Sequence, residues 1–225
     1  MPIKSDSLTN RVADEVSRMI LEGRLRPRLG VSHTVMREAL RMLETRGLVQ
    51  VQHGKGVIVS LSSAKALGRS FNAVFRLHAG TLSHLMEVRS ILETEVAQLA
   101  AQRRTDQDLA EMEACLRDME RWSESPSGYV DGDVAFHNAL VEATHNPVLI
   151  NVVSSLQDLL IESREKTFRG PPQGALRALR AHHRLYDMVK AQDALGAREA
   201  MLQHLRETQE DIEIAIKEGR LNHRL

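Results

Sequence analysis

The chain is poor in cysteine and in aromatic residues, and both shortages limit what it can be. Its 225 residues include one cysteine, Cys115, and aromatic residues make up 3% of the total. A single cysteine excludes an intramolecular disulfide and fits a reducing compartment. With so few aromatic rings, the core must be built from Leu, Val, Ile, Met and Ala.

Long apolar runs and an export signal are also absent. No stretch of about 18 apolar residues occurs, which is the length needed to cross a bilayer as a helix. The first ten residues, MPIKSDSLTN, contain no apolar signal-peptide segment. We therefore expect a soluble, cytoplasmic protein with no membrane partner.

Net charge is absent from the chain as a whole but not from its parts. Lys and Arg number 30, and so do Asp and Glu, which makes the formal net charge zero. Residues 1–60 nevertheless hold ten basic and six acidic residues, so the rest of the chain is acidic. A basic N-terminal part on an acidic body is typical of a nucleic-acid reader joined to an effector domain.

The first sixty residues predict two helices and a hairpin. Apolar side chains recur at helical spacing over residues 8–22, and again over residues 32–46, where Ser32 is a suitable N-cap. Residues 48–60 then alternate on both sides of a Gly-Lys-Gly turn, which is the pattern of a two-stranded hairpin. This order is that of a winged helix-turn-helix, with residues 53–56 at the tip of the wing.

The rest of the chain predicts helices only. About seven amphipathic segments follow one another, separated by Gly, Pro and N-cap residues, and no strand pattern interrupts them. The first segment covers residues 64–79, and a later one runs unbroken over residues 146–168. The predicted fold is therefore mostly α, with a winged helix-turn-helix at 1–61 and an all-α antiparallel bundle of about seven helices at 62–225.

Four side chains of the predicted bundle have the types and spacing of one metal site. Asp133 and His137 stand four residues apart, so on a helix both leave the same face. His182 and His204 each lie in a separate apolar-periodic segment. One carboxylate and three imidazoles suit a borderline divalent ion, zinc first, with Ni²⁺, Mn²⁺ or Fe²⁺ as alternatives. Such a set leaves a coordination position for a water or a ligand oxygen.

The string GVSHTVMREALRMLETRGLVQVQHGKGVIV resembles the DNA-binding domain of the GntR family of bacterial transcriptional regulators. The resemblance implies that the start of the second helix faces the major groove or its phosphates, and that the wing lies near the minor groove. The residues that it assigns to DNA are Ser32, His33, Thr34, Arg37, His53 and Lys55. Side chains at the N-terminus of a recognition helix do reach base edges and phosphates. The alternative for Arg37 and Arg41 is a solvated helical face paired with neighbouring glutamates.

Two departures from the family pattern affect this domain. His33 and Val35 stand where the family commonly has Arg and Pro, so a base-reading position lacks a bidentate guanidinium. Pro27 runs directly into Arg28, where the family has about a dozen further residues that carry a second helix. Either the gene is shortened here or the sequence omits a segment, and we favour an omission because both flanks keep the pattern. Without that helix, the apolar face of the recognition helix would be partly uncovered.

The bundle resembles the FCD effector domain that accompanies one GntR subfamily. The matching strings are EVRSILETEVAQLAA and DVAFHNALVEATHNPVL, together with the pair His182 and His204. The resemblance implies that the four residues named above ligate the metal. It also implies that Arg89 faces the same cavity, where it would pair with a ligand carboxylate in fork geometry. The alternative for Arg89 is a surface salt bridge with Glu93, four residues further on.

These observations predict a ligand-responsive DNA-binding transcriptional regulator, and the resemblance favours a repressor. We expect a homodimer on a roughly palindromic operator. A small carboxylate, such as an organic or sugar acid, would complete the shell of the metal and contact Arg89. The ligand would act by favouring one domain arrangement, with the linker near Leu61 to Ala64 carrying the change.

Three alternatives to this function remain. Asp, His, His and His around a metal could activate water in a metal-dependent hydrolase. We do not expect an enzyme, because no separate general-base motif occurs and a DNA-binding domain would be unexplained. The metal could instead be the signal itself, or it could only brace the bundle.

Overall fold

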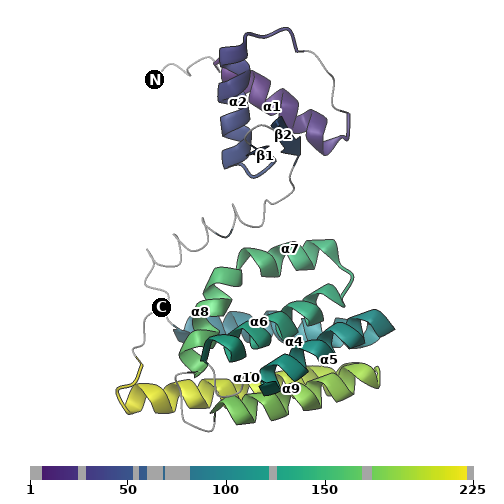
Figure 1. The fold of residues 1–225 in the computed structure, drawn as a ribbon, viewed down its shortest axis with the longest axis vertical. Coiled ribbons are helices and arrows are strands. Elements are labelled where there is room, and N and C mark those ends of the chain that lie inside the picture. Colours follow the sequence, from purple (N-terminus) through teal and green to yellow (C-terminus); the bar gives the residue numbers. More distant parts are fainter. Residues whose placement is uncertain are drawn as a thin grey trace. The chain divides into compact units, whose positions relative to one another are not determined.

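The computed structural model describes residues 7–24, 29–52, 56–59, 68, 82–121, 126–168 and 174–221 (Figure 1). The chain divides into two compact units, Met1–Ser70 and Phe71–Leu225. Several predicted features lie outside the described residues: His53 and Lys55 of the wing, the linker at Leu61 to Ala64, and all of the predicted helix at 64–79 except Gly68.

The N-terminal unit contains two helices and a hairpin. Helix α1 spans Leu8–Leu21 and α2 spans His33–Thr45. Strand β1 (Val49–Gln52) pairs antiparallel with β2 (Gly56–Val59). A small apolar core joins them, formed by Val12, Ala13, Val16, Ala39, Leu43 and Val49. The order helix, helix, hairpin confirms the predicted winged helix-turn-helix.

Helix α2 begins as predicted and is only partly covered. The Ser32 hydroxyl accepts a hydrogen bond from the backbone N–H of Val35, which satisfies one of the free donors at the helix start. Ala39 and Leu43 are its fully buried residues, while Val35 and Met36 are half-buried. Arg28 follows Pro27 directly in the full sequence. This junction lies outside the described residues, and the interpretation that a segment is missing there stays a prediction.

The C-terminal unit is a helical bundle. Its described helices are α4 (Leu82–Arg103), α5 (Asp106–Arg121), α6 (Pro126–Glu142), α7 (Pro147–Ser155), α8 (Gln157–Phe168), α9 (Gly174–Lys190) and α10 (Ala194–Lys217). Helix α10 packs along α4 and α9, and α5 packs along α6 (Figure 1). The main core is aliphatic, and the rings it contains are Tyr129, Phe136 and Tyr186. Within the described ranges, no helix is long and apolar enough to span a membrane.

One predicted helix is in fact two. The segment 146–168 was expected to be continuous, but α7 ends at Ser155 and α8 begins at Gln157. The Ser155 hydroxyl donates to the carbonyl oxygen of Val152 at 2.6 Å, and such a bond competes with the helix ladder. No Gly or Pro marks this break, so the apolar periodicity gave no sign of it.

Candidate metal centre

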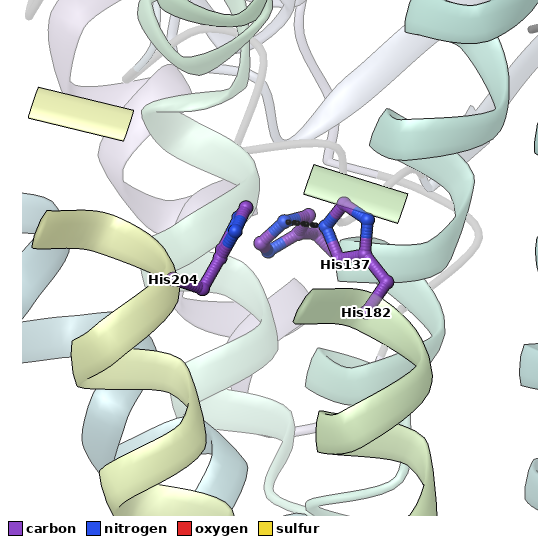
Figure 2. Close-up of side chains that lie close together, drawn as sticks. All are labelled: His137, His182 and His204. Carbon is purple, nitrogen blue, oxygen red and sulfur yellow. Dashed lines mark hydrogen bonds between the residues drawn. The ribbon is translucent and has the colours of Figure 1, made fainter. Parts of the chain in front are cut away.

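Three histidines from three different helices converge inside the C-terminal unit (Figure 2). They are His137 on α6, His182 on α9 and His204 on α10, and all three are buried. One ring nitrogen from each lies within 4.8 Å of the other two. Nε2 of His137 and Nε2 of His182 are 3.2 Å apart.

The helix faces that form the core also place these histidines. His182 lies three residues from both Leu179 and Leu185, which are buried on the same stripe of α9. His204 lies three residues after Met201 and seven after Ala197, which are buried on the same stripe of α10. Each imidazole therefore enters the interior together with its apolar neighbours, as their segments predicted.

Asp133 shares the buried face of α6 with His137, as the four-residue spacing predicted. Its Oδ1 lies 3.4 Å from Nε2 of His182. Its Oδ2 lies 2.6 Å from Nε of Arg164, a residue on α8. One oxygen of this carboxylate thus faces the imidazoles and the other faces a guanidinium. The histidines form the cluster that meets within 4.8 Å, and Asp133 lies beside it.

Several polar atoms at this site are buried without a hydrogen-bond partner. They are Nδ1 of His182, Nδ1 of His204, Oδ2 of Asp133 and Nε of Arg164. The last two lie 2.6 Å apart and form an ion pair with each other, so the two imidazole nitrogens are the atoms left without a partner. An unsatisfied buried polar atom costs about 1–3 kcal/mol, so such a concentration is unusual unless a ligand uses it. Three imidazoles and a carboxylate fit a divalent ion such as zinc.

Burial sets the protonation of the three imidazoles. Desolvation lowers the pKa of His182 to about 3 and that of His204 well below its usual value. Burial also lowers the pKa of His137, and nearby Arg164 adds to this effect. Neutral imidazole is the form that ligates metals, so the site has its ligands ready near neutral pH.

Glu93 on α4 is a buried member of the site that the sequence analysis did not assign to it. Its Oε2 accepts a hydrogen bond from Nδ1 of His137 at 2.7 Å, and its Oε1 lies 2.7 Å from Nε of Arg89. Nη2 of Arg164 lies 3.5 Å away. Burial alone would raise the pKa of Glu93, but these neighbours hold it well below its usual value. The ring of His137 is thereby oriented with Nε2 toward the other imidazoles.

Arg89 lies inside the unit, as the resemblance implied. Its side chain is 2% exposed, so its pair with Glu93 is a buried contact and not a surface salt bridge. Its Nη1 also donates to the hydroxyl of Ser163 on α8, at 3.3 Å. Arg89 therefore has the predicted location, while its guanidinium is already held by a carboxylate of the protein.

A small cavity of about 20 Å³ lies beside His204. The residues that line it are Arg89, Tyr129, Val130, Asp133, Arg164, Gly174, Ala175, Ala178, His204 and Thr208. The Tyr129 hydroxyl donates to the carbonyl oxygen of Ala175 at 2.8 Å, and burial raises its pKa, so it remains a donor. Two guanidinium groups, a carboxylate and one of the imidazoles thus face a single cavity.

Two different sequence patterns explain why Glu93 and Arg164 were not predicted to belong to this site. Glu93 stands four residues after Arg89, so the sequence indicated their pairing but not its burial. Arg164 lies in the string LIESREK, which has the composition of a solvated helix face. In the structure its side chain is only 6% exposed.

Four of the six residues assigned to DNA lie at the start of α2. Ser32, His33, Thr34 and Arg37 are all exposed there. Arg41, one turn further on, pairs with Glu38 at 2.8 Å on an exposed face, as the alternative for that residue expected. The described part of the N-terminal unit thus presents a row of polar side chains at a helix N-terminus, which is the arrangement that contacts DNA in helix-turn-helix proteins.

Comparison with known families finds two matches. Residues 84–207 match the family described as FCD domain, and residues 25–59 match the bacterial regulatory proteins of the gntR family.

Curated relatives cover most of the chain. The HTH-type transcriptional regulator LutR of Bacillus subtilis is 31% identical over 179 residues, which is 78% of this chain and 82% of the relative. The Glc operon transcriptional activator of Escherichia coli is 28% identical over 228 residues, 92% of this chain and 90% of the relative. The galactonate operon transcriptional repressor of Escherichia coli is 24% identical over 210 residues, 86% of this chain and 92% of the relative.

Solved structures agree in fold. A GntR protein of Streptococcus agalactiae superposes with a TM-score of 0.69 at 26% identity, covering 90% of this chain and 99% of that one. McbR/YncC of Escherichia coli gives a TM-score of 0.50 at 22% identity, covering 94% of this chain and 99% of that one. At that identity, the second likeness speaks for the fold alone.

Proposed function

Because the chain belongs to the gntR family of bacterial regulatory proteins and carries an FCD domain, we propose that it senses a small carboxylate at the three-histidine centre and passes the signal to operator DNA. The chain is a ligand-responsive, DNA-binding transcriptional regulator and not an enzyme. The metal-dependent hydrolase is therefore set aside. The metal, the carboxylate and the direction of regulation are the proposed parts.

The metal is held by His137, His182 and His204, with Asp133 as the fourth ligand. The observation that carries this proposal is the meeting of three buried, neutral imidazoles from three helices, two of which have ring nitrogens without a partner. Zinc suits nitrogen and carboxylate ligands in this number, with nickel, manganese or iron as alternatives. When bound, the ion supplies a Lewis-acid position for an oxygen of the effector.

The effector is a small organic or sugar acid, because the cavity beside the histidines contains buried guanidinium groups. Arg89 lines this cavity, and its planar fork matches a carboxylate. One relative is named for a galactonate operon, which adds a sugar acid to the candidates. The two buried guanidinium groups recognise the shared acid group, and the other residues that line the cavity select among the acids.

Regulation follows from binding at both units. We propose a homodimer whose exposed α2 residues contact two half-sites of a roughly palindromic operator in the cytoplasm. Repression relieved by the acid is the proposed direction. The relatives include both a repressor and an activator, so this direction is decided by measuring transcription with and without the acid.

The test of the metal site is metal content with thermal unfolding of the full chain, with and without a chelator. We expect about one metal per chain in the wild type and in His183→Ala, and none in His182→Ala. His183 is a matched control because it neighbours His182 but is half-exposed and contacts Glu120 at 2.9 Å. Metal retained by His182→Ala would contradict the proposed site.

The test of the effector uses the metal-loaded chain and a panel of acetate, glycolate, L-lactate and D-galactonate. A bound acid stabilises the folded chain by an amount that grows with the logarithm of its concentration relative to the dissociation constant, so the melting temperature should rise. Release of DNA by an acid at constant metal supports the proposal. If a chelator alone releases the DNA, the metal ion is itself the signal. If neither the acid nor the chelator changes DNA binding, the metal has only a structural role in the bundle.

A further inference from the structure

We infer that Arg164 is a second anchor for the carboxylate of the effector, and that it couples binding of the acid to binding of the metal through Asp133. This inference rests on the proposed function and deepens it. It assigns a role to a buried residue that neither the motifs nor the metal-site pattern had singled out.

The position of Arg164 joins the two halves of the site. Its side chain, from α8, is 6% exposed and lines the cavity together with Arg89. Its Nε lies 2.6 Å from Oδ2 of Asp133, while the other oxygen of that carboxylate faces His182. Its Nη2 lies 3.5 Å from Glu93, the carboxylate that orients His137. One guanidinium therefore contacts both acidic groups that support the imidazoles.

Neither carboxylate uses the fork of Arg164 in a bidentate way. Its Nε lies 2.6 Å from Oδ2 of Asp133, and its Nη2 lies 3.5 Å from Oε2 of Glu93. A guanidinium offers five N–H donors in a fixed fork, and a carboxylate is the partner that fits this fork. A carboxylate that enters the cavity can therefore accept hydrogen bonds from the remaining donors of Arg164.

Arg89 is the more fully occupied of the two guanidiniums. Its Nε donates to Glu93 at 2.7 Å and its Nη1 to Ser163 at 3.3 Å. A carboxylate that entered the cavity would have to share Arg89 with these partners. Arg164 loses less when its Nη groups turn to a new acceptor, because its contact with Glu93 is long.

Formal charge explains why the metal and the acid should bind cooperatively. The two guanidiniums pair with the two carboxylates, so their formal charges cancel within the cluster. A divalent ion adds two positive charges to this buried group and draws charge from Asp133. Arg164 is then held less strongly by Asp133, and an anion becomes favourable in the cavity. By linkage, an acid that favours the metal is itself favoured by the metal to the same extent.

The experiment measures zinc affinity by competition with a chromophoric chelator, in sodium acetate or L-lactate and in sodium chloride of equal ionic strength. The full chain is compared with Arg164→Gln, Arg164→Lys and Arg198→Gln. Arg198 is the matched control, because it is an exposed Arg of the same unit that pairs with Glu95 at 3.0 Å. Circular dichroism and thermal unfolding verify that each variant is folded.

We expect the acids to tighten zinc binding at least about fivefold in the wild type and in Arg198→Gln, the low end of usual allosteric couplings. Arg164→Gln should bind zinc with no gain from either acid. Arg164→Lys keeps the positive charge but lacks the forked guanidinium, so the acids should tighten its zinc binding less than they do in the wild type. This variant tests the inference if Arg164→Gln does not fold.

The two ways of failing are distinct. An undiminished gain in both Arg164 variants would overturn the role of Arg164 while leaving the carboxylate sensor intact. Zinc binding without any gain from the acids in the wild type would overturn the proposed sensor, and this inference with it.

Discussion

At the scale of single residues, Glu93 is a buried carboxylate surrounded by three basic side chains. It is 4% exposed, yet it remains ionised because Arg89, His137 and Arg164 surround it. A carboxylate that accepts the Nδ1–H of a ligating histidine fixes both the tautomer and the direction of the ring. Glu93 thus contributes to the site by orienting His137 and not by contacting an ion.

We therefore predict that Glu93→Gln lowers zinc affinity by about 10–100-fold, the usual effect of losing such a partner. Glu95→Gln is the control, since Glu95 is exposed on the same helix and pairs with Arg198. Chelator competition gives the affinity, and nitrogen NMR of the imidazoles shows whether His137 loses its fixed tautomer. Wild-type affinity together with an altered tautomer would mean that the orientation of the ring does not limit metal binding.

A second residue-scale prediction concerns acid stability. The Asp108 carboxylate accepts hydrogen bonds from the backbone N–H and hydroxyl of Thr105, at 2.6 and 2.7 Å. Burial would raise the pKa of Asp108, but Thr105 and His145 together hold it below its ordinary value of 3.8. A depressed folded-state pKa stabilises the fold above the unfolded value and is lost as pH falls through the folded one.

Asp108→Asn should therefore destabilise the protein by about 1 kcal/mol at neutral pH, a typical contribution of a helix-capping residue. The difference in the free energy of unfolding between the variant and the wild type should shrink as the pH falls below 3.8, because the wild-type carboxyl becomes protonated there. Denaturant unfolding at several pH values measures this. Asp106→Asn is the control, because the side chain of Asp106 is 98% exposed. A difference that does not change with pH would show that the charge of Asp108 is irrelevant.

At the scale of helices, the close approach of α5 and α6 depends on Gly132. A Cβ built there would lie 2.7 Å from Cγ of Met119 and 3.3 Å from its backbone nitrogen. Glycine next to Asp133 therefore lets the helix that carries two of the proposed ligands pack against the backbone of α5. In an exposed helix, replacing Gly with Ala would instead stabilise by about 1 kcal/mol.

We predict that Gly132→Ala instead lowers the free energy of unfolding, by about 1–3 kcal/mol, because the added methyl group overpacks the contact with Met119. Zinc affinity should fall as well, because displacing α6 moves Asp133 and His137 together. Ala135→Gly is a useful contrast, since Ala135 is exposed on the same helix and should show only the propensity effect. A stabilised Gly132→Ala protein would mean that Met119 rearranges without strain.

Element-scale patterns also explain what the sequence could and could not predict. The 3.6-residue period placed Asp133, His137, His182 and His204 on inward faces, because each stands among apolar neighbours. The break between α7 and α8 gave no sign, since a serine hydroxyl bonded to a backbone carbonyl marks it instead of a Gly or Pro. Arg164 was missed because an arginine among charged residues predicts solvent exposure. Its burial depends on carboxylates from other helices, which periodicity cannot pair.

At the scale of the whole molecule, the candidate site collects side chains from much of the bundle. Arg89 and Glu93 come from α4, and Arg164 from α8. The three histidines come from α6, α9 and α10. Any ligand that contacts this cluster changes interactions between five helices at once, which is how a small binding event can favour one arrangement of a bundle over another. The placement of the site suits a sensor for this reason.

The last prediction separates DNA binding from sensing within one chain. Arg37→Gln should weaken binding to an operator selected from random duplexes, with little change in sequence preference, and should reduce the salt slope by about 1 if Arg37 contacts phosphate. Its zinc affinity and acid response should stay at wild-type values. Arg41→Gln is the control, because Arg41 already pairs with Glu38 at 2.8 Å.

His182→Ala should give the reverse pattern, with DNA affinity retained and its dependence on acid lost. Electrophoretic mobility shift and fluorescence anisotropy, at fixed zinc with and without L-lactate, measure both quantities on the same samples. If Arg37→Gln bound operator as tightly as the wild type, the start of α2 would not be the DNA-contacting surface. If His182→Ala still released DNA in response to the acid, the signal would enter the protein somewhere other than the three-histidine centre.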